Sequence, residues 1–210
     1  MNIYSCYTDS HSELFQMMKE SLEKTNPDLN LISEKFPQDC ETGNFGEKGW
    51  SDTMHRKTGQ ILSAIKNEDV FIYTDADVYF LKPFKDKILE ELGDYDIALQ
   101  DDSISGLCTG FWIAKSSDRM YNLWLDAKNN IERFGNEQNA LTSLIHRHPI
   151  RWKMLSRSTV FTYGHLGLGI WNNNSFEFDR NIAVAHANWT VGIENKTNLI
   201  KYIRNKIENQ

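Results

Sequence analysis

An unbroken apolar run at residues 70–73, Val-Phe-Ile-Tyr, constrains the fold of this chain more than any other segment. β-Branched and aromatic residues without a polar interruption are typical of a strand buried on both faces, as in a parallel sheet covered by helices. Asp75 and Asp77 follow the run directly. Because side chains alternate along an extended chain, residues spaced by one point to the same side. We therefore expect two carboxylates on one side, at the carboxyl end of a buried strand.

The pair of Asp75 and Asp77 is typical of a site for Mg²⁺ or Mn²⁺. These ions accept carboxylate oxygens as ligands, and in open α/β sheets the ligand crevice lies at the carboxyl ends of the strands. The structural alternative is that the pair only caps or turns the strand end, as Asp often does. The triplet by itself leaves both interpretations open.

Length and charge narrow the class of protein. A chain of 210 residues is expected to form one domain, residues 1–210, and its net charge of −6 gives no long-range attraction for nucleic acid. No apolar run approaches the length of a membrane span, and the N-terminus lacks a signal-peptide pattern. The three cysteines are widely spaced and lack zinc spacing, which favours a reduced, cytoplasmic setting; they are Cys6, Cys40 and Cys108.

The rest of the chain predicts the alternating order of an α/β fold. A strand over residues 3–8, a helix over 13–24 and a strand over 29–33 form a strand–helix–strand opening. Loop-like residues 36–50 are long for a connection, which favours a functional or mobile loop. We expect one α/β domain with a mostly parallel central sheet flanked by helices. Further strands are predicted over 96–100, 109–114, 152–155 and 182–185, and further helices over 53–67, 85–92, 117–133 and 198–207 and from 136 onward.

A histidine near the C-terminus is a candidate third metal ligand. His186 follows a short apolar strand, and neutral imidazole can join two carboxylates around a divalent ion. A single histidine at a strand end is more often structural. Here it follows a candidate carboxylate pair, and Lys196 stands in the same segment.

Four segments together resemble a GT-A type glycosyltransferase of the nucleotide-diphospho-sugar transferase family. Their order along most of the chain is more specific than any one of them. Glu137 departs from the family, which commonly has Asp there, and the chain is short for the family. The segments are residues 74–78 with Lys82 and Pro83, similar to the D-x-D strand; 109–113, similar to the acceptor-side strand; 137–141, similar to a D-Q-x-x-L helix start; and 186–188 with Gly192 and Lys196, similar to a closing H-x-N…G…K segment.

The resemblance implies a set of metal and phosphate contacts. Asp77 and His186 would bind Mn²⁺ or Mg²⁺ directly, and Asp75 would bind it through water or hold the ribose. Lys57 would lie near the sugar or diphosphate, and Lys196 would contact the diphosphate. A metal bridging the phosphates stabilises the anionic leaving group as a Lewis acid, and lysines add to that stabilisation.

The resemblance also implies a nucleoside contact and an acceptor side. The end of the first strand, residues 5–8 with Tyr7 and Thr8, would contact the base and ribose. An inverting reaction needs a carboxylate that takes the proton from the acceptor hydroxyl. In a retaining reaction no such base is required, and Glu137 and Gln138 would position the sugar. The candidate bases are Asp101, Asp102 and Glu137, and the residues implied to line the donor sugar and acceptor are Thr109, Gly110, Glu137 and Gln138.

These features predict a metal-dependent glycosyltransferase that moves a hexosyl or pentosyl group from a nucleotide-diphosphate donor to a hydroxyl acceptor. The resemblance favours a UDP-sugar donor, because members of the family commonly use one. The acceptor is expected to be a carbohydrate or glycoprotein. Trp189 is a candidate sugar platform. Two alternatives stay open: a metal-dependent phosphohydrolase that uses the same Asp pair, and a sugar-nucleotide-binding module without activity.

Overall fold

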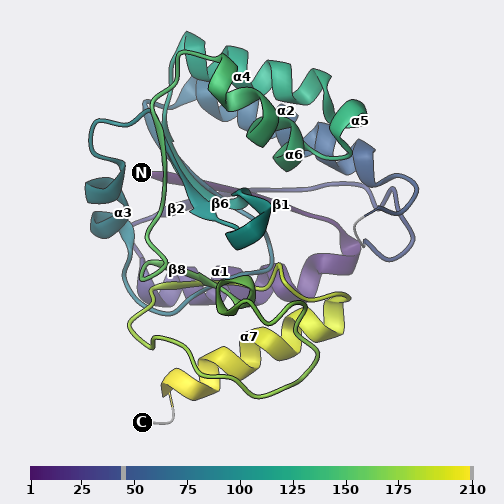
Figure 1. Cartoon of the computed structure of the whole chain (residues 1–210), viewed down its shortest axis with the longest axis vertical. Helices are drawn as coiled ribbons and strands as arrows, with labels where there is room; N and C mark the ends of the chain where they lie inside the picture. Colours follow the sequence, from purple (N-terminus) through teal and green to yellow (C-terminus); the bar gives the residue numbers. More distant parts are fainter. Residues whose placement is uncertain (44–45, 209–210) are drawn as a thin grey trace.

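The computed structural model describes residues 1–43 and 46–208, with Ser105 described by its backbone only (Figure 1). A six-stranded sheet runs through the middle of the molecule in the order β2-β1-β3-β6-β5-β7. Its strands are β1 (Asn2–Tyr7), β2 (Asn30–Lys35), β3 (Val70–Thr74), β5 (Ile97–Asp101), β6 (Leu107–Lys115) and β7 (Trp152–Met154).

Parallel pairing dominates this sheet. β1 pairs in parallel with β2 and with β3, and β5 pairs in parallel with β7. Only β6 runs against its two neighbours, β3 and β5. The expected α/β fold with a mostly parallel central sheet is therefore confirmed. The parallel setting inferred for residues 70–73 applies to one side of β3, because its other neighbour is antiparallel.

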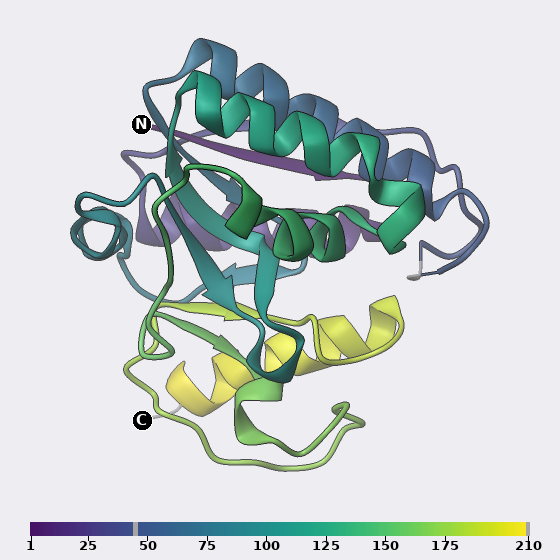
Figure 2. The ribbon, with the colours of Figure 1, turned by 45° about the horizontal axis from the view of Figure 1, so that its top comes forward.

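Helices cover both faces of the sheet. The helices α2 and α4 lie side by side over one face, with α5 and α6 beside them, and Figure 2 shows this pair across the top of the molecule. The other face carries α1 and α3, and α7 lies outermost. Their bounds are α1 (Ser12–Thr25), α2 (Trp50–Asn67), α3 (Lys85–Leu92), α4 (Asp118–Asn129), α5 (Ile131–Phe134), α6 (Glu137–Leu144) and α7 (Ile193–Glu208).

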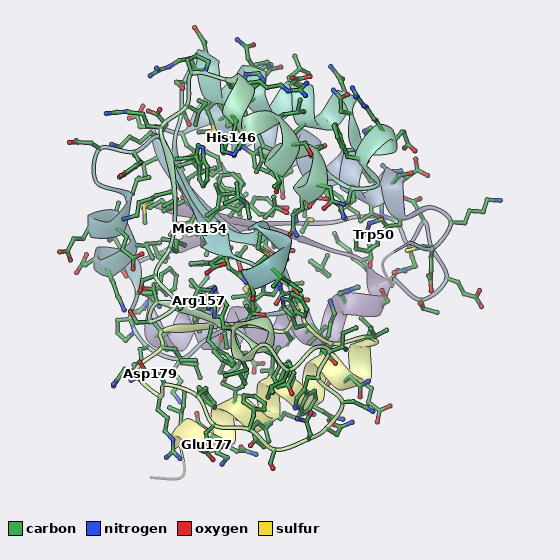
Figure 3. All side chains as sticks on the ribbon, viewed as in Figure 1. Trp50, His146, Met154, Arg157, Glu177 and Asp179 are labelled. Carbon is green, nitrogen blue, oxygen red and sulfur yellow. The ribbon has the colours of Figure 1, made fainter. Side chains whose placement is uncertain are left out.

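The unbroken apolar run of β3 follows from this layering. Phe71 and Tyr73 pack into the cluster under α2 and α4, whereas Ile72 packs into the cluster under α1 and α3. All three side chains are fully buried. Alternating side chains of a strand enter opposite layers, so a strand covered on both sides needs no polar position. Side chains project from the sheet and the helices into the space between the layers (Figure 3).

A second, three-stranded sheet with the order β4-β9-β8 lies between the central sheet and α7. Its strands are β4 (Val78–Phe80), β8 (Val160–Thr162) and β9 (Val184–His186). β8 and the short 3-10 helix η4 (Tyr163–Leu166) lie between the strands predicted over 152–155 and 182–185, where no element was predicted. Short 3-10 turns η1 (Asp9–His11), η2 (Ser103–Ser105) and η3 (Ile145–Arg147) complete the chain.

Several predicted boundaries are wrong by a few residues, and one predicted helix is in fact two helices. The helix expected over 117–133 divides at Asn130 into α4 and α5, and the Asn130 side chain donates to the carbonyl of Asp126 at 2.9 Å. The C-terminal helix begins at Ile193, earlier than residue 198. The loop expected over 36–50 ends where α2 begins, and its residues 44 and 45 lie outside the described residues.

Candidate active site

The two aspartates stand where the chain passes from one sheet to the other. β3 ends at Thr74 and β4 begins at Val78, and residues 75–77 between them form a turn. The amide of Asp75 donates to the Gly110 carbonyl at 2.7 Å, and the carbonyl of Asp77 accepts from Ala187 at 3.0 Å. We expected the alternation of side chains along a strand to put both carboxylates on one side. That reason is wrong, because Asp75 and Asp77 lie on a turn and not on a strand. Backbone bonds to β6 and to the segment after β9 hold the turn instead.

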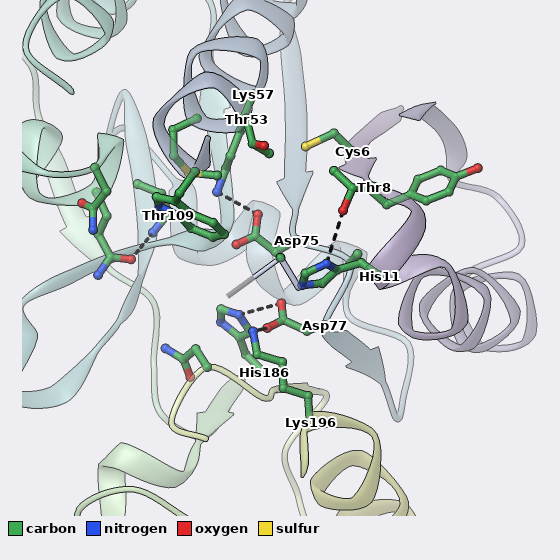
Figure 4. Close-up of a pocket in the computed structure, with 18 of the residues that line it drawn as sticks. Cys6, Thr8, His11, Thr53, Lys57, Asp75, Asp77, Thr109, His186 and Lys196 are labelled. Carbon is green, nitrogen blue, oxygen red and sulfur yellow. Dashed lines mark hydrogen bonds and ion pairs between the residues drawn. The ribbon is translucent and has the colours of Figure 1, made fainter. Parts of the chain in front are cut away.

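Asp75, Asp77 and His186 form one group that fits a divalent metal ion. Each offers a ligand atom, and these atoms all lie within 4.8 Å of one another. Nε2 of His186 lies 3.1 Å from a carboxylate oxygen of Asp77 (Figure 4). Two carboxylates and one imidazole are a donor set suited to Mn²⁺ or Mg²⁺, and they leave positions for other oxygen ligands.

The Asp77 carboxylate contacts the side chains of Lys196 and His186. Nζ of Lys196 lies 2.5 Å from its second oxygen, and both carboxylate and imidazole are buried. Burial alone would raise the pKa of Asp77, but Lys196 and His186 outweigh it and hold that pKa well below its usual range. Asp77 is therefore ionised at neutral pH, as a metal ligand must be.

A second charged group lies beside the first. Nζ of Lys57, from α2, lies 2.7 Å from Asp75 and 2.8 Å from Glu137, and Thr109 Oγ1 donates to Glu137 at 2.9 Å. Burial would lower the pKa of Lys57, but the two carboxylates raise it. Burial would raise the pKa of Glu137, yet Lys57 and Thr109 lower it. Lys57 and Glu137 are therefore ionised, and with Asp75 they join α2 and α6 to the turn after β3.

Asp102 is held differently, by neutral donors. Its carboxylate accepts from Gln138 Nε2 at 3.1 Å, from the Trp189 indole N–H at 3.0 Å and from the Asn188 amide. Burial raises the pKa of Asp102, and the hydrogen bonds from Trp189 and Gln138 only partly offset this. Asp101 stands outside this arrangement. Its carboxylate lies 2.6 Å from Arg157 Nε and accepts from the Ser103 amide at 2.7 Å.

A cavity of about 420 Å³ joins these groups, a volume typical of small-molecule sites. It brings together the predicted catalytic, donor-binding and metal-binding residues except Asp101, and of the residues predicted to line the donor sugar and acceptor it lacks Gly110. The predicted residues that line it are Tyr7, Thr8, Lys57, Asp75, Asp77, Asp102, Thr109, Glu137, Gln138, His186 and Lys196.

One family model, described as nucleotide-diphospho-sugar transferase, matches residues 16–200 of the chain. The chain belongs to that family. It is therefore a glycosyltransferase, as the sequence segments predicted. A comparison with curated proteins gives no match.

Solved glycosyltransferases with the GT-A fold share the transferase's architecture. A glycosyltransferase involved in the glycosylation of the major capsid of PBCV-1 is similar with a TM-score of 0.68 and 14% identity, over 96% of this chain and 100% of that one. The galactosyltransferase LgtC, in complex with donor and acceptor sugar analogs, gives 0.57 and 13%, over 96% and 95%. GlyE of Streptococcus pneumoniae gives 0.61 and 14%, over 96% and 60%.

No helix within the described residues is long and apolar enough to cross a membrane.

Sequence reasoning missed several side chains that line the transferase's cavity. His11 belongs to η1, between the strand predicted over 3–8 and the helix predicted over 13–24, and its Nδ1 lies 3.0 Å from Ser10 Oγ. Burial and Lys196 lower the pKa of His11. All three cysteines also line the cavity, and none forms a disulfide. Their position at strand ends, Cys6 in β1 and Cys108 in β6, was the available signal.

Proposed function

We propose that the transferase uses a divalent metal ion to move a sugar from a nucleotide-diphosphate donor, a UDP-sugar by expectation, to a hydroxyl group of a carbohydrate or glycoprotein in glycan biosynthesis. The observation that carries this proposal is the convergence of Asp75, Asp77 and His186 in one cavity with two lysines. The three side chains supply metal ligands. Lys57 and Lys196 supply positive charge beside them.

The metal ion, when bound by Asp75, Asp77 and His186, would act as a Lewis acid on the diphosphate leaving group. Lys196 is the side chain best placed to assist. It is partly exposed, with 21% of its side-chain surface accessible, and reaches the cavity from α7. Lys57 is almost fully enclosed between two carboxylates, so its main role is to fix the positions of Asp75 and Glu137. Tyr7 and Thr8, at the end of β1, line the part of the cavity proposed for the nucleoside.

Asp102 is the strongest of the three candidate bases. A base needs a pKa raised toward the operating pH and access to the acceptor hydroxyl. Asp102 lines the cavity and its pKa is raised by burial, whereas the pKa of Glu137 is lowered. Asp101 is paired with Arg157 and does not line the cavity. Gln138, bonded to Asp102, then serves to position the acceptor or the donor sugar.

The acceptor side of the cavity has an apolar edge. Trp189 lines the cavity with its indole N–H fixed on Asp102, and its ring lies against Gly164, where a Cβ would overlap it. Ile170 and Val191 line the same edge and are 60% and 59% exposed. Aromatic and aliphatic side chains beside carboxylate and amide groups suit the mixed surface of a sugar.

The test is isothermal titration of UDP and of GDP, with and without Mn²⁺, into the wild type and into Asp77→Ala. We expect one nucleotide to bind in the micromolar range only when Mn²⁺ is present, and the variant to lose that binding. Asp94→Asn, at an exposed position outside the cavity lining, is the matched control and should bind as the wild type does. Binding that ignores Mn²⁺ and Asp77 would overturn the proposal.

A donor assay then separates the two alternatives. Slow donor hydrolysis that is converted to sugar transfer by an acceptor supports the transferase. Release of phosphate without transfer to any sugar would favour a phosphohydrolase, and donor binding without turnover would favour an inactive binding module. The single domain over residues 1–210 and the cytoplasmic setting stay predictions.

A further inference from the structure

The imidazole of His186 is held from its far side by a buried glutamine. Gln100, in β5, is fully buried, and its Oε1 lies 2.9 Å from Nδ1 of His186. An amide oxygen only accepts, so this contact requires a hydrogen on Nδ1. In the neutral ring that binds a metal ion, the other nitrogen, Nε2, then presents its lone pair to Asp77 Oδ1 at 3.1 Å. Two acceptors that face each other at this distance are satisfied by a cation between them.

An irregularity in the central sheet places Gln100 there. Leu99 pairs with Trp112, but Gln100 pairs with Cys108, so the register of β5 against β6 shifts between these two residues. Bulges of this kind redirect side chains and are common beside active sites. The shift leaves residues 109–111 of β6, which include Gly110, without partners in β5. The His186 ring lies against Gly110. A Cβ at Gly110 would overlap that ring.

Packing alone does not account for a glutamine at this position. The amide nitrogen of Gln100 is buried and has no hydrogen-bond partner among the described residues. A buried donor without a partner is unfavourable for folding, and an aliphatic side chain of similar size would avoid it. The side-chain oxygen of Gln100, which contacts Nδ1 of His186, is therefore the atom that explains a glutamine here.

We propose that Gln100 is a positioning residue that fixes the tautomer and the ring orientation of His186 for binding a divalent cation. The inference rests on the proposed metal-dependent function and adds to it a residue that does not itself touch the metal. Groups that hold the second nitrogen of a ligating histidine fix its tautomer, and their loss typically weakens metal binding about 10- to 100-fold. Gln100 is such a group, whereas Gly110 provides the space for the ring.

The first experiment titrates Mn²⁺ into the full chain without nucleotide and follows free Mn²⁺ by electron paramagnetic resonance. Gln100→Leu removes the acceptor and should weaken Mn²⁺ binding about 10- to 100-fold. Gln100→Glu keeps an acceptor at the same place and should hold the affinity within about threefold of wild type or improve it. Urea unfolding of both variants checks that each is folded at the titration temperature.

The second experiment reads the tautomer directly. Protein labelled with ¹³C and ¹⁵N in histidine reports which ring nitrogen carries the hydrogen, and a His186→Gln spectrum assigns the signal. We expect Nδ1 to carry a hydrogen in the metal-free wild type and in Gln100→Glu, and only a fraction of the rings to do so in Gln100→Leu. An Nε2–H form in the wild type would overturn the proposal, because the amide nitrogen of Gln100 would then be facing the ring.

The outcomes separate this inference from the proposed function. If Mn²⁺ binds in an Asp77-dependent way and Gln100→Leu binds it equally well, the role of Gln100 is wrong and the metal site stands. If the wild type binds no Mn²⁺, the metal-dependent function is wrong. In that case the histidine spectra still decide whether Gln100 sets the tautomer of His186.

Discussion

Lys57 and Glu137 form a buried ion pair in which the ammonium nitrogen lies 2.8 Å from a carboxylate oxygen and each side chain is only 4% exposed. Asp75 lies 2.7 Å from the same nitrogen and is 30% exposed, so it faces the cavity. The pair thus lies beneath the metal group and joins α2 to α6. Lys57 is the ammonium partner of both carboxylates, Asp75 and Glu137, so its loss leaves Glu137 buried without a positive charge beside it.

Replacing Lys57 with Met should destabilise the fold by about 3–5 kcal/mol, because removing one partner leaves a buried charge without compensation. Urea unfolding at pH 7 measures this. Lys66→Met, on the exposed face of the same helix, is the control and should cost less than about 1 kcal/mol. Equal effects of the two substitutions would mean that the buried pair contributes nothing specific.

The stability supplied by Glu137 should depend on pH in a defined direction. Its pKa is lower in the folded protein than in the unfolded chain. The ionised carboxylate therefore contributes stability above the unfolded pKa of about 4.3, and this contribution is lost as pH falls through the folded pKa. Urea midpoints of the wild type and Glu137→Gln from pH 7 to pH 3 should converge toward the acid end. A gap that widens on acidification would contradict the ion pair.

Asp102→Asn should reduce the rate of sugar transfer about 100- to 10,000-fold, the range for loss of a general base. Asn keeps the shape of the side chain but cannot accept a proton. Mn²⁺-dependent UDP binding should stay within about threefold, because Asp102 is not among the proposed metal ligands. Transfer by Asp102→Asn at the wild-type rate would exclude Asp102 as the base and favour a retaining reaction.

Gly164→Ala should disturb acceptor use through Trp189. The new methyl group overlaps the indole ring, so the ring must leave its place on Asp102. We expect the acceptor KM to rise about 3- to 10-fold, as for loss of one aromatic contact, while donor hydrolysis without acceptor is unchanged. Gly167→Asn is the control, because Gly167 has φ of +67° and open space around its Cβ position, and Asn tolerates that backbone region. An unchanged acceptor KM in Gly164→Ala would exclude Trp189 as the platform.

The cavity cysteines should react slowly while the protein is folded. Burial raises the pKa of Cys6 to about 12 and that of Cys108 well above its ordinary value, so both remain thiols at neutral pH. Because the thiolate is the nucleophile, iodoacetamide at pH 8 should label them at least about 100-fold more slowly than in urea. Mass spectrometry of labelled peptides over time measures both rates. Rapid labelling of folded protein would show that the thiols are ionised or exposed.

Local pattern was sufficient for most of the helices and strands and for most of the predicted residues that line the cavity. The apolar run before Asp75 predicted a strand because a strand covered on both faces has no polar position, and both faces of β3 are covered. The grouping of Asp75, Asp77 and His186 was predictable because these residues follow or end apolar strands. The family's segments added Lys196 and Gln138 at matching positions, and both line the cavity.

Contacts between distant segments decided what the sequence could not. The aspartates lie on a turn between two sheets, which no local periodicity distinguishes from a continuing strand. Asp101 and Asp102 are adjacent and chemically alike, yet only Asp102 lines the cavity, because Arg157 pairs with Asp101 and Gln138 and Trp189 bond to Asp102. Side-chain chemistry and strand pattern are local and were readable from the sequence. The direction in which each carboxylate faces, its pKa and the partner that holds His186 depend on residues brought together only by folding.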